Sequence, residues 1–181
     1  KLVLMNEASK STLSTKSQLS WYAVTTRSRH EKVVAEQLWQ KKIECFLPLR
    51  AVLSKWKDRR KKVQFPLFAG YLFVNVSMME RRLDILKIPS IANIVGLNGH
   101  PLPIPKEQID SVKRLVFSTL PYDPYPYISE GTRVEIIRGA LKGLQGILLE
   151  KKSDCRFILS VSLIQQAVSC EVNCHDVEKI G

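Results

Sequence analysis

Basic side chains crowd one stretch of this sequence, and the chemistry that they offer is the neutralisation of phosphate. From residue 27 to 62 there are 12 Lys and Arg against 4 Asp and Glu, a net charge of +8. From residue 131 to 181 there are 7 against 6, a net charge of +1. Lys and Arg pair with phosphates, and aromatic rings stack on exposed bases. The first stretch therefore favours contact with nucleic acid, although a run of charge is also typical of a solvated surface.

The basic residues form two groups. One group flanks a predicted helix and contains Arg27, Arg29, His30, Lys32, Lys41 and Lys42. The other fills a predicted hairpin tip around Trp56 and contains Lys55, Lys57, Arg59, Arg60, Lys61 and Lys62. The net charge of the whole chain is +11, so a polyanionic partner is expected.

A metal site and a catalytic site are both poorly supported by spacing. Cys170, Cys174 and His175 could ligate zinc, but no second pair of ligands follows, and adjacent residues of a strand point to opposite faces. Reduced, partly buried strand cysteines are the favoured interpretation. No nucleophile and base stand at a local spacing that indicates general acid–base chemistry. We expect a binding protein rather than an enzyme, with no metal and no cofactor.

Three glycines form the pattern GxxxGxxG at Gly139, Gly143 and Gly146. No Gly-Lys-Ser/Thr follows, so the pattern is not a Walker phosphate loop, and its spacing is not that of a dinucleotide site. The pattern instead predicts turns between two strands.

The elements that carry the basic residues have a mixed order. The sequence predicts strands at 21–27, 44–53 (interrupted by Pro48), 70–76 and 91–97, with the hairpin tip at 55–62. It predicts helices at 28–42, from 77 to about 89, and at 105–117; the first two begin with the capping boxes Ser28–Glu31 and Ser77–Glu80. The order β-α-β-β-α-β-α is that of a ferredoxin-like α+β domain.

The remainder of the chain reads differently. Residues 118–130 contain three prolines and favour an extended, semi-rigid linker, with an ordered loop packed on its tyrosines as the alternative. Residues 131–181 contain five short strand-like runs at spacings typical of a small antiparallel barrel.

The first 20 residues are rich in Ser, Thr and Lys, and we expect them to be flexible, with Met5 as the natural start. Their apolar run is too short for a signal peptide. No window approaches 18 uninterrupted apolar residues, so no helix is expected to span a membrane. Four cysteines without a secretory signal favour a reduced, cytoplasmic protein.

Two segments resemble one family. WYAVTTRSRHEKVVAEQL (21–38) followed by FPLFAGYLFV (65–74) is similar to the N-terminal (NGN) domain of NusG-family transcription elongation factors. EGTRVEIIRGALKGLQGILLE (130–150) resembles a KOW motif, with the expected residues Gly131, Val134, Ile136, Gly139, Gly143, Gly146 and Leu148. The resemblance implies an NGN-like domain at 21–117, the linker at 118–130, and a five-stranded SH3-like KOW barrel at 131–181.

The resemblance also implies a function. The N-terminal domain of the family binds the clamp helices of RNA polymerase and suppresses pausing or termination, and the KOW domain recruits the termination factor Rho or a small-subunit ribosomal protein. The family's polymerase contact corresponds to Pro66, Leu67, Phe68, Gly70 and Tyr71 here. Phe68 is expected to face outward. Ala69 stands where the family usually has proline before the glycine.

PLFAGYLFV (66–74) and SLIQQAVSCEV (162–172) look closer to specialised antiterminators of the RfaH type. This implies contact with exposed non-template DNA or nascent RNA, for which the candidates by position are Arg29, His30, Lys32, Gln37 and Lys41. One such paralogue refolds its KOW domain into helices; strand runs rich in Val, Ile and Ser favour a barrel as the resting state here. A monomer is expected. The alternative is a ribosome-associated KOW protein that binds RNA, against which the near-neutral C-terminal region argues.

Overall fold

The computed structural model describes residues 4–5, 18–56, 59–151 and 154–180. The chain divides into two compact units, Lys1–Lys106 and Glu107–Gly181. This boundary falls at the start of helix α3 (Lys106–Phe117), whereas the sequence predicts a boundary after that helix. Within the second unit, the Gln108 Oε1 atom on α3 accepts a hydrogen bond from the Ser162 N–H at 3.3 Å.

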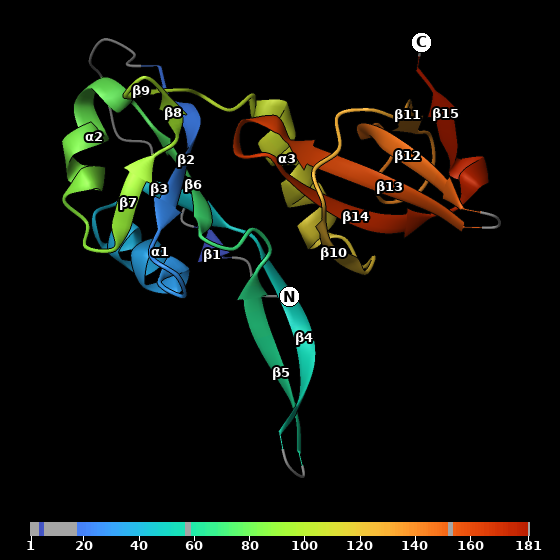
Figure 1. Ribbon diagram of the computed structural model, residues 1–181, viewed down its shortest axis with the longest axis horizontal. Helices are drawn as coiled ribbons and strands as arrows, with labels where there is room; N and C mark the ends of the chain where they lie inside the picture. Colours follow the sequence, from blue (N-terminus) through green and yellow to red (C-terminus); the bar gives the residue numbers. More distant parts are fainter. Residues whose placement is uncertain (1–3, 6–17, 57–58, 152–153, 181) are drawn as a thin grey trace. The chain divides into compact units, whose positions relative to one another are not determined.

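The first unit is built on a five-stranded sheet. The strands are β1 (Leu4–Met5), β3 (Glu44–Leu47), β6 (Tyr71–Val76), β2 (Ser20–Thr26) and β7 (Ile91–Ile94), in that spatial order. All of their pairings are antiparallel. The helices are α1 (Glu31–Gln40) and α2 (Met78–Leu86) (Figure 1). The predicted ferredoxin-like arrangement is confirmed.

Both faces of this sheet carry buried side chains, because alternate residues of a strand point to opposite sides. On β6, Leu72 and Val74 join the core that contains Val34 and Leu38 of α1. Phe73 lies between them in sequence and contacts Phe46 and Phe68 instead. The sheet therefore has a helix-covered aliphatic face and a second face that is rich in phenylalanine.

A long two-stranded ribbon leaves the sheet between β3 and β6 (Figure 1). It consists of β4 (Leu49–Trp56) and β5 (Arg59–Pro66), paired from Leu49↔Pro66 to Trp56↔Arg59. The predicted interruption at Pro48 is confirmed. The tip predicted at 55–62 is wrong in extent, because both strands run through most of it. Charged side chains such as Lys and Arg are common on strands that are not covered by a sheet neighbour.

The helix starts differ from the predicted capping boxes. Helix α1 begins after His30, not Ser28, and His30 makes no side-chain capping bond. Ser77 does precede α2 as its N-cap, but its hydroxyl makes no capping bond. The predicted strand 91–97 is divided, since β7 ends at Ile94 and β8 (Gly96–Leu97) forms a small hairpin with β9 (His100–Pro101). Capping signatures located these helices but not their hydrogen bonds.

The second unit combines α3 with a six-stranded antiparallel sheet. Its spatial order is β10 (Tyr122–Tyr125), β14 (Gln166–Val172), β13 (Asp154–Val161), β12 (Gln145–Lys151), β11 (Thr132–Ile136) and β15 (Val177–Lys179). Two short 3₁₀ turns, η1 (Ser162–Ile164) and η2 (Cys174–Asp176), follow β13 and β14. The five predicted strands correspond to β11–β15, and β10 is an additional one.

Strand β10 corrects the prediction of a linker. Tyr122–Tyr125 pairs with β14, from Tyr122↔Cys170 to Tyr125↔Ala167. Tyr122 is buried, and the Arg156 guanidinium lies 5.9 Å from the centre of the Tyr125 ring. Proline is compatible with an edge strand, because an edge leaves one side of the backbone without a ladder partner. The structure agrees with the alternative prediction, an ordered segment that packs through its tyrosines.

Two further expectations are corrected. Leu4–Met5 forms an edge strand, so it departs from the flexible segment predicted at 1–20, of which residues 1–3 and 6–17 lie outside the described residues. Cys155 and Cys174 form a disulfide, so the prediction that all four cysteines are reduced is wrong for this pair. Cys45 and Cys170 are free and buried. Cys155 and Cys174 stand 19 positions apart, and no local spacing indicated their pairing.

No helix among the described residues is long and apolar enough to cross a membrane.

Candidate functional site

Residues 65–71, called the docking segment below, lead from the ribbon into β6. Two backbone hydrogen bonds fasten the segment to neighbouring elements, and a third lies within it. The Leu67 N–H donates to the Pro48 carbonyl at 2.8 Å, and the Thr26 N–H donates to the Gly70 carbonyl at 2.9 Å. The Tyr71 N–H donates to the Phe68 carbonyl at 3.1 Å and closes a tight turn. Gly70 has a φ of +79°, a conformation that glycine adopts without strain.

The prediction that Phe68 faces outward is wrong. Its side chain is fully buried, and its ring meets the Phe73 ring edge to face, with centroids 6.0 Å apart. Leu67 is also buried. The alternation of the strand does not extend into a turn, so the sequence pattern left the direction of Phe68 open. Burial of these two apolar side chains removes their surface from water, which the hydrophobic effect favours.

Other residues of the docking segment reach solvent. The Phe65 side chain is 46% exposed. Ala69 is exposed, and Pro66, Gly70 and Tyr71 are half-buried. Phe65 and Tyr71, at the two ends of the segment, are therefore accessible, whereas Phe68 packs in the core beneath the turn.

Glu31 is a residue that the sequence reading misassigned. It is only 4% exposed, and its Oε1 atom accepts a hydrogen bond from the Gly70 N–H at 2.8 Å. A carboxylate that accepts a backbone N–H makes a strong, charge-assisted bond. Glu31 thus joins the first turn of α1 to the docking segment. Its position in a helix start pointed to capping, and nothing local indicated Gly70, which lies 39 residues away.

The structure brings four of the predicted nucleic-acid residues together at the start of α1. Arg27, Arg29, His30 and Lys32 are all exposed. The His30 Nδ1 atom lies 2.7 Å from the Ser90 hydroxyl oxygen. The Lys32 ammonium donates to the Gln64 carbonyl at 2.8 Å, so the start of α1 touches the base of the ribbon. The cluster and the ribbon together form a cationic surface on the first unit.

The remaining candidates are distributed differently. Lys41 is exposed but follows the opposite end of α1, away from the cluster. Gln37, a nucleic-acid candidate by position, is half-buried, and its Oε1 atom is enclosed without a hydrogen-bond partner. Arg59, Arg60 and Lys61 lie on β5, and Lys57 lies outside the described residues.

The predicted KOW residues surround the hairpin of β11 and β12. Val134 and Ile136 are buried on β11. Gly139 and Gly143 lie in the connecting turns with φ values of +81° and +84°. Gly131, which precedes β11, also has a positive φ. Gly146 lies inside β12, where it faces Val134, and so the prediction that it supplies a turn is wrong.

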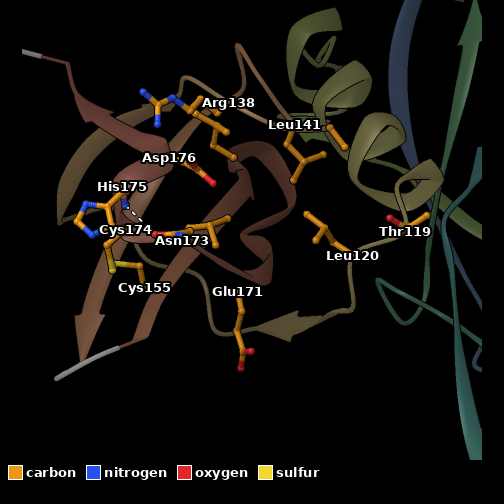
Figure 2. A pocket seen from close by; sticks show the side chains of 14 residues that line it. Thr119, Leu120, Arg138, Leu141, Cys155, Glu171, Asn173, Cys174, His175 and Asp176 are labelled. Carbon is orange, nitrogen blue, oxygen red and sulfur yellow. Dashed lines mark hydrogen bonds between the residues drawn. A yellow bond between two sulfur atoms is a disulfide. The ribbon is translucent and has the colours of Figure 1, made fainter.

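A groove of about 630 Å³ opens on the second unit (Figure 2). Apolar side chains of Leu120 and Leu141 line one part of it, and Arg138, Glu171 and His175 line another. The Cys155–Cys174 disulfide also lines it. Within the described part of the chain, no three His, Cys, Asp or Glu residues are grouped as metal ligands. The walls of the groove are therefore mixed, with apolar and charged side chains.

The comparison with known proteins decides the family. The family described as "Transcription termination factor nusG" matches residues 19–113, which is more than half of the 181-residue chain. The chain belongs to the NusG family. It is a NusG-type transcription factor, and such factors act on the transcription machinery.

Proteins named NusG match over nearly their whole length. The "Transcription termination/antitermination protein NusG" of Lactococcus lactis subsp. lactis is 24% identical over 176 residues, which cover 88% of this chain and 92% of that protein. The protein of the same name from Haemophilus influenzae is 26% identical over 179 residues, covering 92% and 97%. The solved structure of Thermotoga maritima NusG aligns with a TM-score of 0.53 at 22% identity, covering 90% and 98%. This last likeness concerns the fold.

Proposed function

We propose that this NusG-family chain is a processivity and antitermination factor that binds RNA polymerase through its first unit and acts without catalysis. The docking segment would contact the clamp helices of the polymerase. The cationic surface of α1 and the ribbon would contact non-template DNA or nascent RNA. The second unit would recruit a further protein, with Rho and a small-subunit ribosomal protein as the family's precedents.

One observation carries the proposal. The docking segment is held from three sides, by Pro48, Thr26 and Glu31, yet leaves Phe65 and Tyr71 accessible. A binding surface gains affinity when its anchors are ordered before the partner arrives, because less conformational entropy is lost on association. Aromatic residues are enriched among such anchors. The cationic cluster at the start of α1 lies at the base of the same ribbon.

Tyr71→Ala is expected to weaken polymerase binding by about 30-fold, which corresponds to about 2 kcal/mol for a central aromatic anchor. The measurement is the dissociation constant of purified polymerase core for the full chain. Leu97→Ala is the control, since it also truncates a large side chain, one that is 64% exposed elsewhere on the first unit. Equal affinity of the Tyr71→Ala variant and the wild type would refute the docking role.

Replacing Arg59, Arg60 and Lys61 with glutamine is expected to reduce the slope of log K against log salt concentration by about 2–3 for binding to a nucleic-acid duplex. Each lost phosphate contact removes about one released counterion. Arg133, Lys142 and Lys179 are exposed basic residues of the second unit, and their replacement by glutamine makes the same change in net charge. A slope that falls equally in both triple variants would show that only total charge matters.

The specialised RfaH-type role stays a prediction that transcription in vitro can test. A pausing template is transcribed with and without the protein while the non-template sequence around the pause is varied. A specialised factor is expected to act on a subset of these templates. An effect of equal size on all of them would identify a general elongation factor instead.

A further inference from the structure

The Cys155–Cys174 disulfide is not used by the proposed function. Cys155 is the second residue of β13 and is buried, whereas Cys174 lies exposed in η2. Both residues line the groove of the second unit, and Figure 2 shows the bond beside His175. A reductant that enters this groove therefore reaches Cys174 more readily than the buried Cys155.

Apart from the disulfide, backbone hydrogen bonds rather than buried side chains hold this segment. None of the residues of η2 is buried, and the residues of β15 are half-buried or exposed. Two bonds within the turn are local, from the Asp176 N–H to the Asn173 carbonyl at 2.9 Å and from the His175 N–H to Asn173 Oδ1 at 3.0 Å. The Ile137 N–H donates to the Asp176 carbonyl at 2.8 Å, and β15 pairs with β11. Segments with few buried side chains open at low free-energy cost.

We propose that Cys155–Cys174 is a reversible thiol–disulfide exchange site for a thiol reductant, and that its reduction loosens residues 174–180 and reshapes the groove. The proposal rests on the proposed function in one respect, because a transcription factor works in the compartment whose thiols are kept reduced. Disulfides in that compartment are usually transient or redox-sensing rather than structural.

The exchange balances in two steps. The thiolate of the reductant attacks Sγ of Cys174, the Cys155–Cys174 bond breaks, and Cys155 leaves as a thiolate that takes a proton from water. A second thiol then attacks the reductant's sulfur in the mixed disulfide, which frees the Cys174 thiol and leaves the reductant as a disulfide. Two electrons pass from the reductant to the protein. Oxidised reductant reverses both steps.

The other two cysteines stay outside this chemistry. Burial raises the pKa of the Cys45 thiol to about 12 and, with weaker effect, that of Cys170 to about 11. Their thiolates are scarce at neutral pH, and the thiolate is the reactive form. They serve as internal references for the measurement.

The test equilibrates the full chain in glutathione buffers of different reduced-to-oxidised ratios, followed by acid quenching, alkylation and peptide mass spectrometry. Cys155 and Cys174 are expected to convert together from disulfide to alkylated thiol as the ratio rises, while Cys45 and Cys170 remain thiols throughout. Hydrogen exchange of the amides at 174–180 and at Ile137 is expected to accelerate by about tenfold or more on reduction, with the centres of β13 and β14 unchanged.

Two variants sharpen the result. Cys155→Ser with Cys174→Ser should show the fast exchange at every ratio, and Cys170→Ala should respond as the wild type does. The proposal is overturned if no ratio yields the disulfide, if reduced glutathione and dithiothreitol leave it intact in the native protein, or if reduction leaves exchange at 174–180 unchanged. Polymerase affinity is measured in both redox states. If neither redox state binds polymerase, the proposed function is refuted, while the result for thiol–disulfide exchange still stands.

Discussion

Phe68→Ala is expected to lower the free energy of unfolding by about 3–5 kcal/mol, the usual range for removing a buried phenylalanine. The ring is fully buried and packs edge to face on Phe73, which in turn stacks on Phe46 with centroids 6.0 Å apart. Alanine would leave a cavity among these rings. Urea unfolding followed by tryptophan fluorescence measures the loss, since Trp21 is buried in the same unit.

Phe65→Ala is the matched control for this prediction. It removes the same side chain three residues earlier, from a site that is 46% exposed, so the free energy of unfolding should change by less than about 1 kcal/mol. A wild-type midpoint for Phe68→Ala would contradict the burial of the ring and would restore an exposed anchor at that position. Reduced polymerase binding by Phe68→Ala is meaningful only where the variant is still folded.

Gly146→Ala is expected to destabilise the second unit by about 1–3 kcal/mol, because the added methyl group overpacks a strand. A Cβ atom at this position would lie 2.5 Å from the Ile158 carbonyl oxygen and 2.7 Å from the Phe157 ring. The first of these atoms belongs to the backbone, so relief requires a shift of β12 against β13. Hydrogen exchange of the β12 and β13 amides in urea reports the loss locally.

Gly139→Ala is the control for steric crowding. Nothing lies within 4 Å of a Cβ atom there, and its φ of +81° makes only the backbone conformation unfavourable for alanine. That strain costs about 1–2 kcal/mol and should leave β12–β13 pairing intact. If both variants accelerated exchange equally in β12 and β13, the close approach of Ile158 to Gly146 would not be the cause.

Local pattern was sufficient for most elements of the fold. Helical periodicity located α1 and α3, a capping box located α2, and strand patterns located the sheet strands other than β1 and β10. Pro48 marked the break between β3 and β4. These signals work because side-chain direction along one element follows from the geometry of its backbone. The same reasoning failed for the lengths of β4 and β5, because their run of basic residues suggested a turn, whereas a two-stranded ribbon also accommodates charged residues.

Partners that lie far apart in the chain escaped prediction. Glu31 binds the Gly70 N–H, Cys155 bonds to Cys174, and Tyr122 to Tyr125 pairs with β14. Each residue has a plausible local role, as a cap, a thiol or part of a linker. Only folding brings a distant partner close enough to replace that local role. Whether the distant pairing forms depends on this proximity and on the free-energy cost of leaving a buried polar group unpaired.

By itself the sequence determined the basic character of residues 27–62, the ferredoxin-like order of the first unit, and the resemblance that the family match on residues 19–113 supports. The tertiary structure decided which residues of the docking segment are accessible, turning Phe68 inward while Phe65 and Tyr71 reach solvent. The physical reason is that charge and periodicity are properties of the sequence, whereas the solvent exposure of a side chain depends on which other parts of the protein pack against it. A turn has no fixed alternation, so only its hydrogen bonds to Pro48, Thr26 and Glu31 orient its side chains.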